Sequence, residues 1–149
     1  MTEVRFYHLQ KQNLDVALPA ILQKAFQSGK NIVVRMQNDS EIERMNKHLW
    51  AFKPDVFLPH GSKKDGHAEH QPIWLSASND NPNNAKILIL TQGQKEENLK
   101  PYDLCCEMLD GRDENAISEA RVRWKEYQAT GHDVTYWFQN ENGGWVKKA

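Results

Sequence analysis

Asn-Ile-Val-Val-Arg-Met, at residues 31–36, sets the fold class of this chain. Its run of β-branched residues suits a strand covered on both faces, as in a parallel sheet. Ser40 and Glu43 follow closely and read as a capping box that opens a helix. The apolar row of that helix is Ile42, Met45 and Leu49. A buried strand that leads directly into a helix predicts an α/β fold.

The preceding segment repeats this strand-and-helix order. Residues 4–9 read as a strand, and residues 14–26 carry apolar side chains at helical spacing until Gly29. Pro19 lies inside that helical pattern, so the helix either kinks at Pro19 or begins later than Leu14. Both alternatives stay open. Strand, helix, strand, helix is the order of right-handed crossovers in an α/β sheet.

The following segments complete one sheet. Strands are expected at 56–58, 73–75 and 102–108, with residues 87–90 as the central strand. Asp113 would cap a third helix, which ends at Gly131 and has the apolar row Ile117, Ala120, Trp124 and Tyr127. Residues 134–138 and 145–146 flank an Asn-Gly pair and predict a hairpin. We predict a single α/β domain over residues 1–149, with a mixed, mostly parallel sheet, helices on both faces and a C-terminal antiparallel hairpin.

Composition narrows the class of function. The formal net charge is −1, which disfavours a broad basic surface for nucleic acid. The N-terminus lacks the pattern of a secretory signal, and no apolar stretch approaches the ~20 residues that span a bilayer, so we expect a cytoplasmic protein without a membrane partner. Cys105 and Cys106 are adjacent, so on a strand they point to opposite faces and stay reduced.

Catalytic and cofactor motifs are sparse. The glycine-rich turns that hold nucleotides do not occur, and no base is placed beside Cys105 to activate it as a nucleophile. His60, His67, Glu69 and His70 are metal-ligand types, but they lie in a polar run that reads as a solvated loop, so whether this loop binds a metal stays open. We expect no catalytic residue, no metal and no cofactor.

One candidate site remains, on the third helix. Arg121 and Lys125 are four residues apart and share a row, with the indole of Trp124 beside them. Such a face suits an acidic peptide with an apolar end, since arginine can hold a carboxylate through two parallel hydrogen bonds. The alternative is that Trp124 belongs to the core and that both cations are ordinary surface residues.

These residues belong to a longer pattern that resembles the chi subunit of bacterial DNA polymerase III. The matching elements are Phe6-Tyr7 with Leu9, Leu49-Trp50, Phe57-Leu58-Pro59-His60-Gly61, Gln71-Pro72-Ile73, Asn84-Ala85, Leu109-Asp110-Gly111, Ala120-Arg121, Trp124-Lys125 with Tyr127, Gly131-His132 and Tyr136-Trp137. The resemblance implies a non-catalytic α/β adaptor of the clamp-loader complex. Such an adaptor connects the polymerase to the single-stranded-DNA-binding protein and reaches DNA only indirectly.

The resemblance also implies a binding site for the acidic C-terminal tail of that partner. Arg121 would pair with the terminal carboxylate, and Trp124 and Leu109 would flank the last aromatic side chain. Lys125 would attract the acidic residues upstream. Some members carry a basic residue one turn before the arginine, where this chain has Ile117, so the cationic patch is expected to be weaker here.

The resemblance implies a second surface, made of Trp50, Phe57, Pro59 and His60. In related proteins this surface meets the psi subunit of the clamp loader or a helicase, and the resemblance leaves open which of them applies. The alternative is that Trp50 and Phe57 are simply core residues.

Two other classes of function stay open. The first is direct binding of single-stranded nucleic acid through Arg121, Arg123 and Lys125. The second is an enzyme with a small-molecule pocket at the carboxyl ends of the sheet strands, although no set of residues in the sequence supports it.

Overall fold

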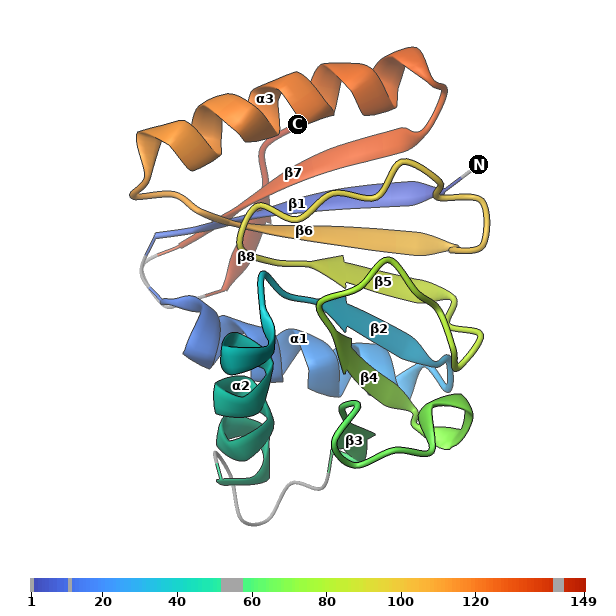
Figure 1. Ribbon diagram of the computed structural model, residues 1–149. Helices are drawn as coiled ribbons and strands as arrows, with labels where there is room; N and C mark the ends of the chain where they lie inside the picture. Colours follow the sequence, from blue (N-terminus) through green and yellow to red (C-terminus); the bar gives the residue numbers. More distant parts are fainter. Residues whose placement is uncertain (1, 11, 52–57, 141–143) are drawn as a thin grey trace.

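The computed structural model describes residues 2–10, 12–51, 58–140 and 144–149, and within these ranges it shows one eight-stranded sheet and three α-helices (Figure 1). The strands are β1 (Glu3–Leu9), β2 (Ile32–Arg35), β3 (His60–Gly61), β4 (Ile73–Ser76), β5 (Ile87–Leu90), β6 (Leu104–Asp110), β7 (Asp133–Gln139) and β8 (Trp145–Lys147). The helices are α1 (Leu14–Gln27), α2 (Asp39–Ala51) and α3 (Glu114–Ala129), with a 3₁₀ turn η1 at Ala68–His70.

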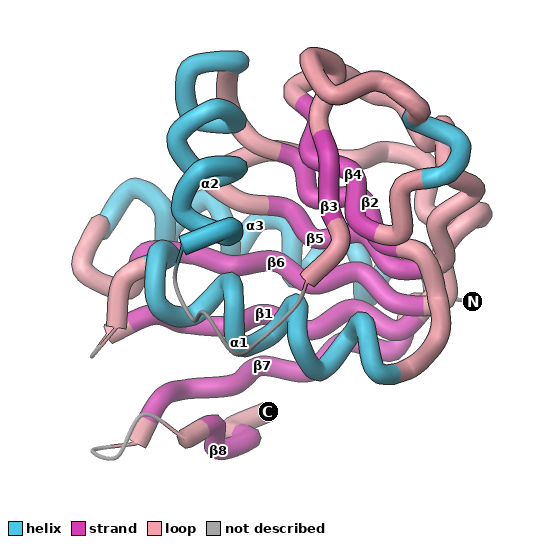
Figure 2. Tube along the Cα trace, turned by 90° about the horizontal axis from the view of Figure 1, so that it is seen from below, coloured by secondary structure: helices cyan, strands magenta, loops and turns pink. Residues whose placement is uncertain are grey.

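The sheet is mostly parallel, as predicted. Its strand order is β3-β4-β2-β5-β6-β1-β7-β8, and β7 with β8 is its antiparallel pair. Residues 87–90 form β5 between β2 and β6, which confirms the predicted central strand. Figures 1 and 2 show α1 and α2 on one face of the sheet and α3 on the other. The predicted α/β class, with helices on both faces, is therefore confirmed.

Two apolar layers form because successive strand residues point to opposite faces. Cys106 lies in the layer under α1 and α2, and Cys105 lies in the layer under α3. Both thiols are free, as expected from their adjacent positions. Burial raises the pKa of Cys106 to about 12 and raises that of Cys105 well above its usual value. Neither thiol is therefore an activated nucleophile.

The helix α1 runs through Pro19 without a break. It begins at Leu14, where the side chain of Asn13 accepts a hydrogen bond from the backbone of Val16. Proline has no N–H group for the carbonyl four residues earlier, which is that of Asp15. The Nε2 atom of His48, on α2, lies 2.6 Å from this carbonyl oxygen and donates the missing hydrogen bond. Of the two alternatives, the late start is therefore wrong.

Two local expectations need correction. Ser40 does not cap α2, because the helix starts earlier and Asn38 Oδ1 accepts the hydrogen bond from the backbone N–H of Glu41 at 2.9 Å. The strand expected at 56–58 is not confirmed, since Leu58 lies outside any strand and 56 and 57 are outside the described residues. The paired strand is instead β3, at His60–Gly61. The expected Asn-Gly turn also lies outside the described residues.

The link between His48 and Pro19 predicts an asymmetric effect on stability. We expect His48→Ala to lower the free energy of unfolding by about 1–3 kcal/mol, because it leaves the Asp15 carbonyl without a donor. In a Pro19→Ala background the helix supplies its own N–H, so the same change should cost clearly less. Urea denaturation of the four proteins measures this difference, and equal costs in both backgrounds would contradict the explanation.

Candidate functional site

The helix α3 carries the candidate site, and both of its ends agree with the sequence. Asp113 accepts hydrogen bonds from the backbone N–H groups of Asn115 and Ala116, which satisfies two of the free donors of the first turn. Gly131 follows the last turn with a φ of +85°, a conformation that favours glycine. The helix therefore begins and ends where its sequence signals predict.

A buried ion pair holds α3 against the sheet. Arg123 Nε donates to Glu107 Oε1 on β6 at 2.7 Å, and the two side chains are 6% and 3% exposed. The hydroxyl of Tyr127 donates to the other carboxylate oxygen, also at 2.7 Å. Burial raises the pKa of Glu107, and the charge of Arg123 opposes that rise. Arg123 is therefore a packing residue and is absent from the surface that direct nucleic-acid binding would need.

This ion pair predicts a strong contrast between two neighbouring arginines. Arg123→Leu should lower the free energy of unfolding by about 3–5 kcal/mol, because it leaves the Glu107 carboxylate buried without a counter-charge. Arg121→Leu is the matched control on the exposed side of the same helix, and it should change stability by no more than about 0.5 kcal/mol. Denaturant unfolding measures both, and similar losses would contradict this assignment of the two arginines.

The other face of α3 presents the predicted cations. Arg121 and Lys125 are both exposed, and Trp124 is half-buried beside them. The indole packs on Phe6 and Tyr136, with ring centroids 5.7 Å and 5.8 Å away. Trp124 thus belongs to the core on one side and is open to solvent on the other, which combines the two alternatives derived from the sequence.

Strand β7 contributes aromatic residues that the sequence argument did not assign to this site. Tyr136 and Phe138 are half-buried on the α3 side of the sheet, and they lie opposite Phe6 and His8 of β1. Burial raises the pKa of Tyr136, and the positive charge of Arg121 opposes that rise. Alternation along β7 was a usable signal for a shared face, but it could not show that this face adjoins Arg121.

Leu109 contributes less than expected to the exposed part of this site. Its side chain is 4% exposed and packs in the layer beneath α3. Leu109 also borders a separate cleft on the other side of α3, and none of Arg121, Trp124 and Lys125 lines that cleft. Leu109 can therefore support the site from beneath, with little surface left for a ligand.

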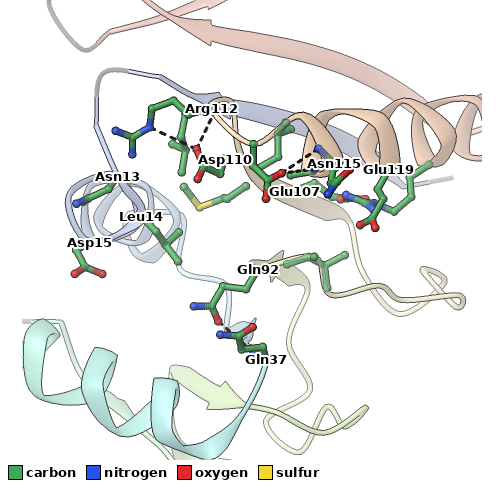
Figure 3. A pocket seen from close by; sticks show the side chains of 18 of the residues that line it. Asn13, Leu14, Asp15, Gln37, Gln92, Glu107, Asp110, Arg112, Asn115 and Glu119 are labelled. Atoms are coloured by element: carbon green, nitrogen blue, oxygen red, sulfur yellow. Dashed lines mark hydrogen bonds and ion pairs between the residues drawn. The ribbon is translucent and has the colours of Figure 1, made fainter.

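That separate cleft, of about 580 Å³, lies at the carboxyl ends of β1, β5 and β6. Here β1 continues into α1 on one face of the sheet and β6 into α3 on the other, the place where α/β sheets commonly bind ligands. Figure 3 shows polar side chains from the starts of α1 and α3, with Gln37 and Gln92, around it. Several charged residues of the cleft already have partners within the protein. Asp15 forms an ion pair with Arg44, and Asp113 caps α3.

The second predicted surface is partly visible. Trp50 is 53% exposed at the end of α2, so it is not a core residue, and its ring centroid lies 4.2 Å from that of His60. His60 is buried, with Nδ1 2.6 Å from the carbonyl oxygen of Leu58 and Nε2 3.1 Å from that of Asn46. Pro59 is half-buried, and Phe57 lies outside the described residues.

Among the described residues, no group of three or more His, Cys, Asp and Glu side chains is arranged to hold a metal ion. In the same ranges, no helix has the length and apolar character needed to cross a membrane.

The fold places the protein in the α/β class, with partly exposed aromatic side chains beside α3 and at the end of α2. The family model described as "DNA polymerase III chi subunit, HolC" matches residues 1–135. A relative from Rickettsia prowazekii (strain Madrid E), described as "Probable DNA polymerase III subunit chi", is 25% identical over 156 residues, which cover 100% of this chain and 93% of the relative. The chain belongs to the DNA polymerase III chi subunit family.

Proposed function

We propose that this chain is a non-catalytic, cytoplasmic adaptor of the bacterial DNA polymerase III holoenzyme. It binds the acidic C-terminal tail of the single-stranded-DNA-binding protein and links that protein to the clamp-loader complex. The observation that carries the proposal is the exposed row of Arg121 and Lys125 beside the half-buried indole of Trp124, in a member of the chi family.

The tail would bind across α3 and β7. Arg121 offers a planar donor pair for the terminal carboxylate, and no ion pair within the described residues occupies it. The last apolar side chain would rest on Trp124, Tyr136 and Phe138, while Lys125 attracts acidic residues further upstream. This assignment moves the apolar contact from Leu109 toward β7, because Leu109 is nearly inaccessible.

Such a contact would be weak alone and effective in numbers. A short tail held by one charge pair and one apolar side chain suits micromolar affinity, about 8 kcal/mol. Many tails displayed on coated single-stranded DNA would make rebinding frequent and hold the polymerase on the lagging strand. Because both cations are exposed, the attraction should weaken once salt shortens the Debye length below about 8 Å.

Charge reversal at the site tests the proposal. Arg121→Glu should weaken binding of a tail peptide by at least about tenfold, since it replaces a charge-assisted hydrogen bond with repulsion. Lys24→Glu, an exposed cation on α1 at the opposite face, is the matched control and should leave affinity unchanged. Calorimetric titration at low and high salt measures both, and affinity indifferent to salt and to Arg121→Glu would contradict the proposal.

We further propose that the surface of Trp50, Phe57, Pro59 and His60 meets the second partner, the psi subunit or a helicase. An exposed tryptophan packed against a buried histidine is an apolar anchor, the type of residue that dominates binding energy at interfaces. It lies at the β3 end of the sheet, away from α3 (Figure 1).

A mutation in one surface should therefore weaken binding of one partner and leave binding of the other unchanged. Trp50→Ala should cost at least about 2 kcal/mol in binding purified psi or helicase partner and leave affinity for the tail peptide unchanged. Arg121→Glu should show the reverse pattern. Pull-down from the native host, with both partners identified by mass spectrometry, checks this, and loss of both partners in either variant would contradict the separation.

Two alternatives keep a specific test. A module that binds single-stranded nucleic acid could use Arg121 and Lys125 for phosphate contacts, but not Arg123, which is buried. A gel shift with a bare oligonucleotide tests for such binding. An enzyme would use the cleft at the carboxyl ends of the strands, and thermal shift against nucleotides and metal ions examines that possibility. The adaptor is favoured because the cleft's charged residues largely pair with one another.

A further inference from the structure

A buried histidine lies directly behind the proposed tail site. His8, on β1, is 5% exposed, and its ring stacks on Phe138 with centroids 4.3 Å apart. Its Nδ1 atom lies 3.0 Å from the hydroxyl oxygen of Tyr136. A Cβ atom at Gly111 would lie only 2.2 Å from the histidine ring, so the turn before α3 confines that ring. His8 and Tyr136 are therefore held in one relative orientation.

Only one proton can lie between the Tyr136 oxygen and His8 Nδ1, and the other ring nitrogen decides which group supplies it. Nε2 of His8 is buried and has no hydrogen-bond partner among the described residues. A proton on Nε2 would create a buried N–H donor with nothing to bond, and such groups are rare in folded proteins. A proton on Nδ1 instead donates to the Tyr136 oxygen. The second arrangement is favoured.

This arrangement determines what the tyrosine offers to a ligand. When the oxygen of Tyr136 accepts from His8, its own O–H hydrogen must point away from the histidine. Trp124, three residues after Arg121 on α3, packs against the same tyrosine ring. The half-buried ring is held by Phe6, stacked at 5.7 Å, and by Trp124. Its hydroxyl is therefore a pre-oriented donor at the edge of the aromatic layer under α3.

We infer that Tyr136, oriented by His8, donates a hydrogen bond to the same peptide carboxylate that Arg121 holds, and so helps the site to select a free chain end. This inference rests on the proposed tail-binding function. One carboxylate oxygen would receive the tyrosine O–H and the other the guanidinium. A carboxamide at the same place lacks the charge that strengthens both bonds.

The protonation states agree with this role. Burial lowers the pKa of His8, against the smaller opposing effect of Asp110, so the imidazole is neutral and has one N–H to place. Burial raises the pKa of Tyr136, so the phenol keeps its hydrogen. The charges of Asp110 and Arg121 affect the pKa values of this pair. The rings packed against the pair are those of the uncharged residues Phe6, Phe138 and Trp124.

Tyr136→Phe tests the inference because it removes the hydroxyl and keeps the ring. With an acidic peptide that ends in an apolar residue and a free carboxylate, affinity should fall on the order of tenfold, the effect of one hydrogen bond to a charged group. With the amidated peptide, wild type and variant should differ much less. Tyr7→Phe, which removes a phenol hydroxyl on the opposite face, is the matched control and should bind both peptides as wild type does.

The outcomes separate the two proposals. If wild type does not bind the free-acid peptide, the tail-binding function is overturned and this inference with it. If wild type binds and Tyr136→Phe binds equally well, only the inference is overturned. Nitrogen chemical shifts of His8 in the unliganded protein give a second measure. A proton on Nδ1 supports the inference, and a proton on Nε2 overturns it.

Discussion

The buried ion pair between Arg123 and Glu107 fixes which side of α3 faces the sheet. In a helix of 3.6 residues per turn, Arg121 and Arg123 point about 200° apart. Once Arg123 is held against Glu107 and the Tyr127 hydroxyl takes the other carboxylate oxygen, Arg121 must face outward. The exposed row of Arg121 and Lys125 therefore depends on a neighbouring arginine of identical chemistry whose role is structural.

The aromatic layer beneath α3 has two functions at once. Phe6, Trp124 and Tyr136 contact one another between the helix and the sheet, which stabilises the docking of α3 through burial. Trp124 and Tyr136 remain partly exposed at the edge of that layer, so the same packing presents an apolar surface next to a cation. If this surface binds a peptide as proposed, its packing limits the conformational entropy that it would lose on binding.

The positions of the two surfaces fit a protein that connects partners. The α3 surface lies over β1 and β7, and the Trp50 surface lies at the β3 end of the same sheet (Figure 1). The sheet between them is covered on both faces by apolar layers. Two partners could therefore bind at once without competing for contacts.

Sequence periodicity was sufficient for much of the fold, because buried strands and amphipathic helices are local patterns. It predicted β5 as the central strand, α3 from its Asp113 cap to Gly131, and the row of Arg121, Trp124 and Lys125. It misplaced the cap of α2, where Asn38 competes with Ser40, and it could not decide the course of α1 at Pro19. The continuous course of α1 through Pro19 depends on His48, a hydrogen-bond donor from another helix. Only the tertiary structure separated exposed Arg121 from buried Arg123, because packing sets the rotation of a helix about its axis. It also brought Tyr136 and His8 to the candidate site, because these residues lie on strands that are distant in the sequence. A linear pattern records neither the helix rotation nor the strand pairing.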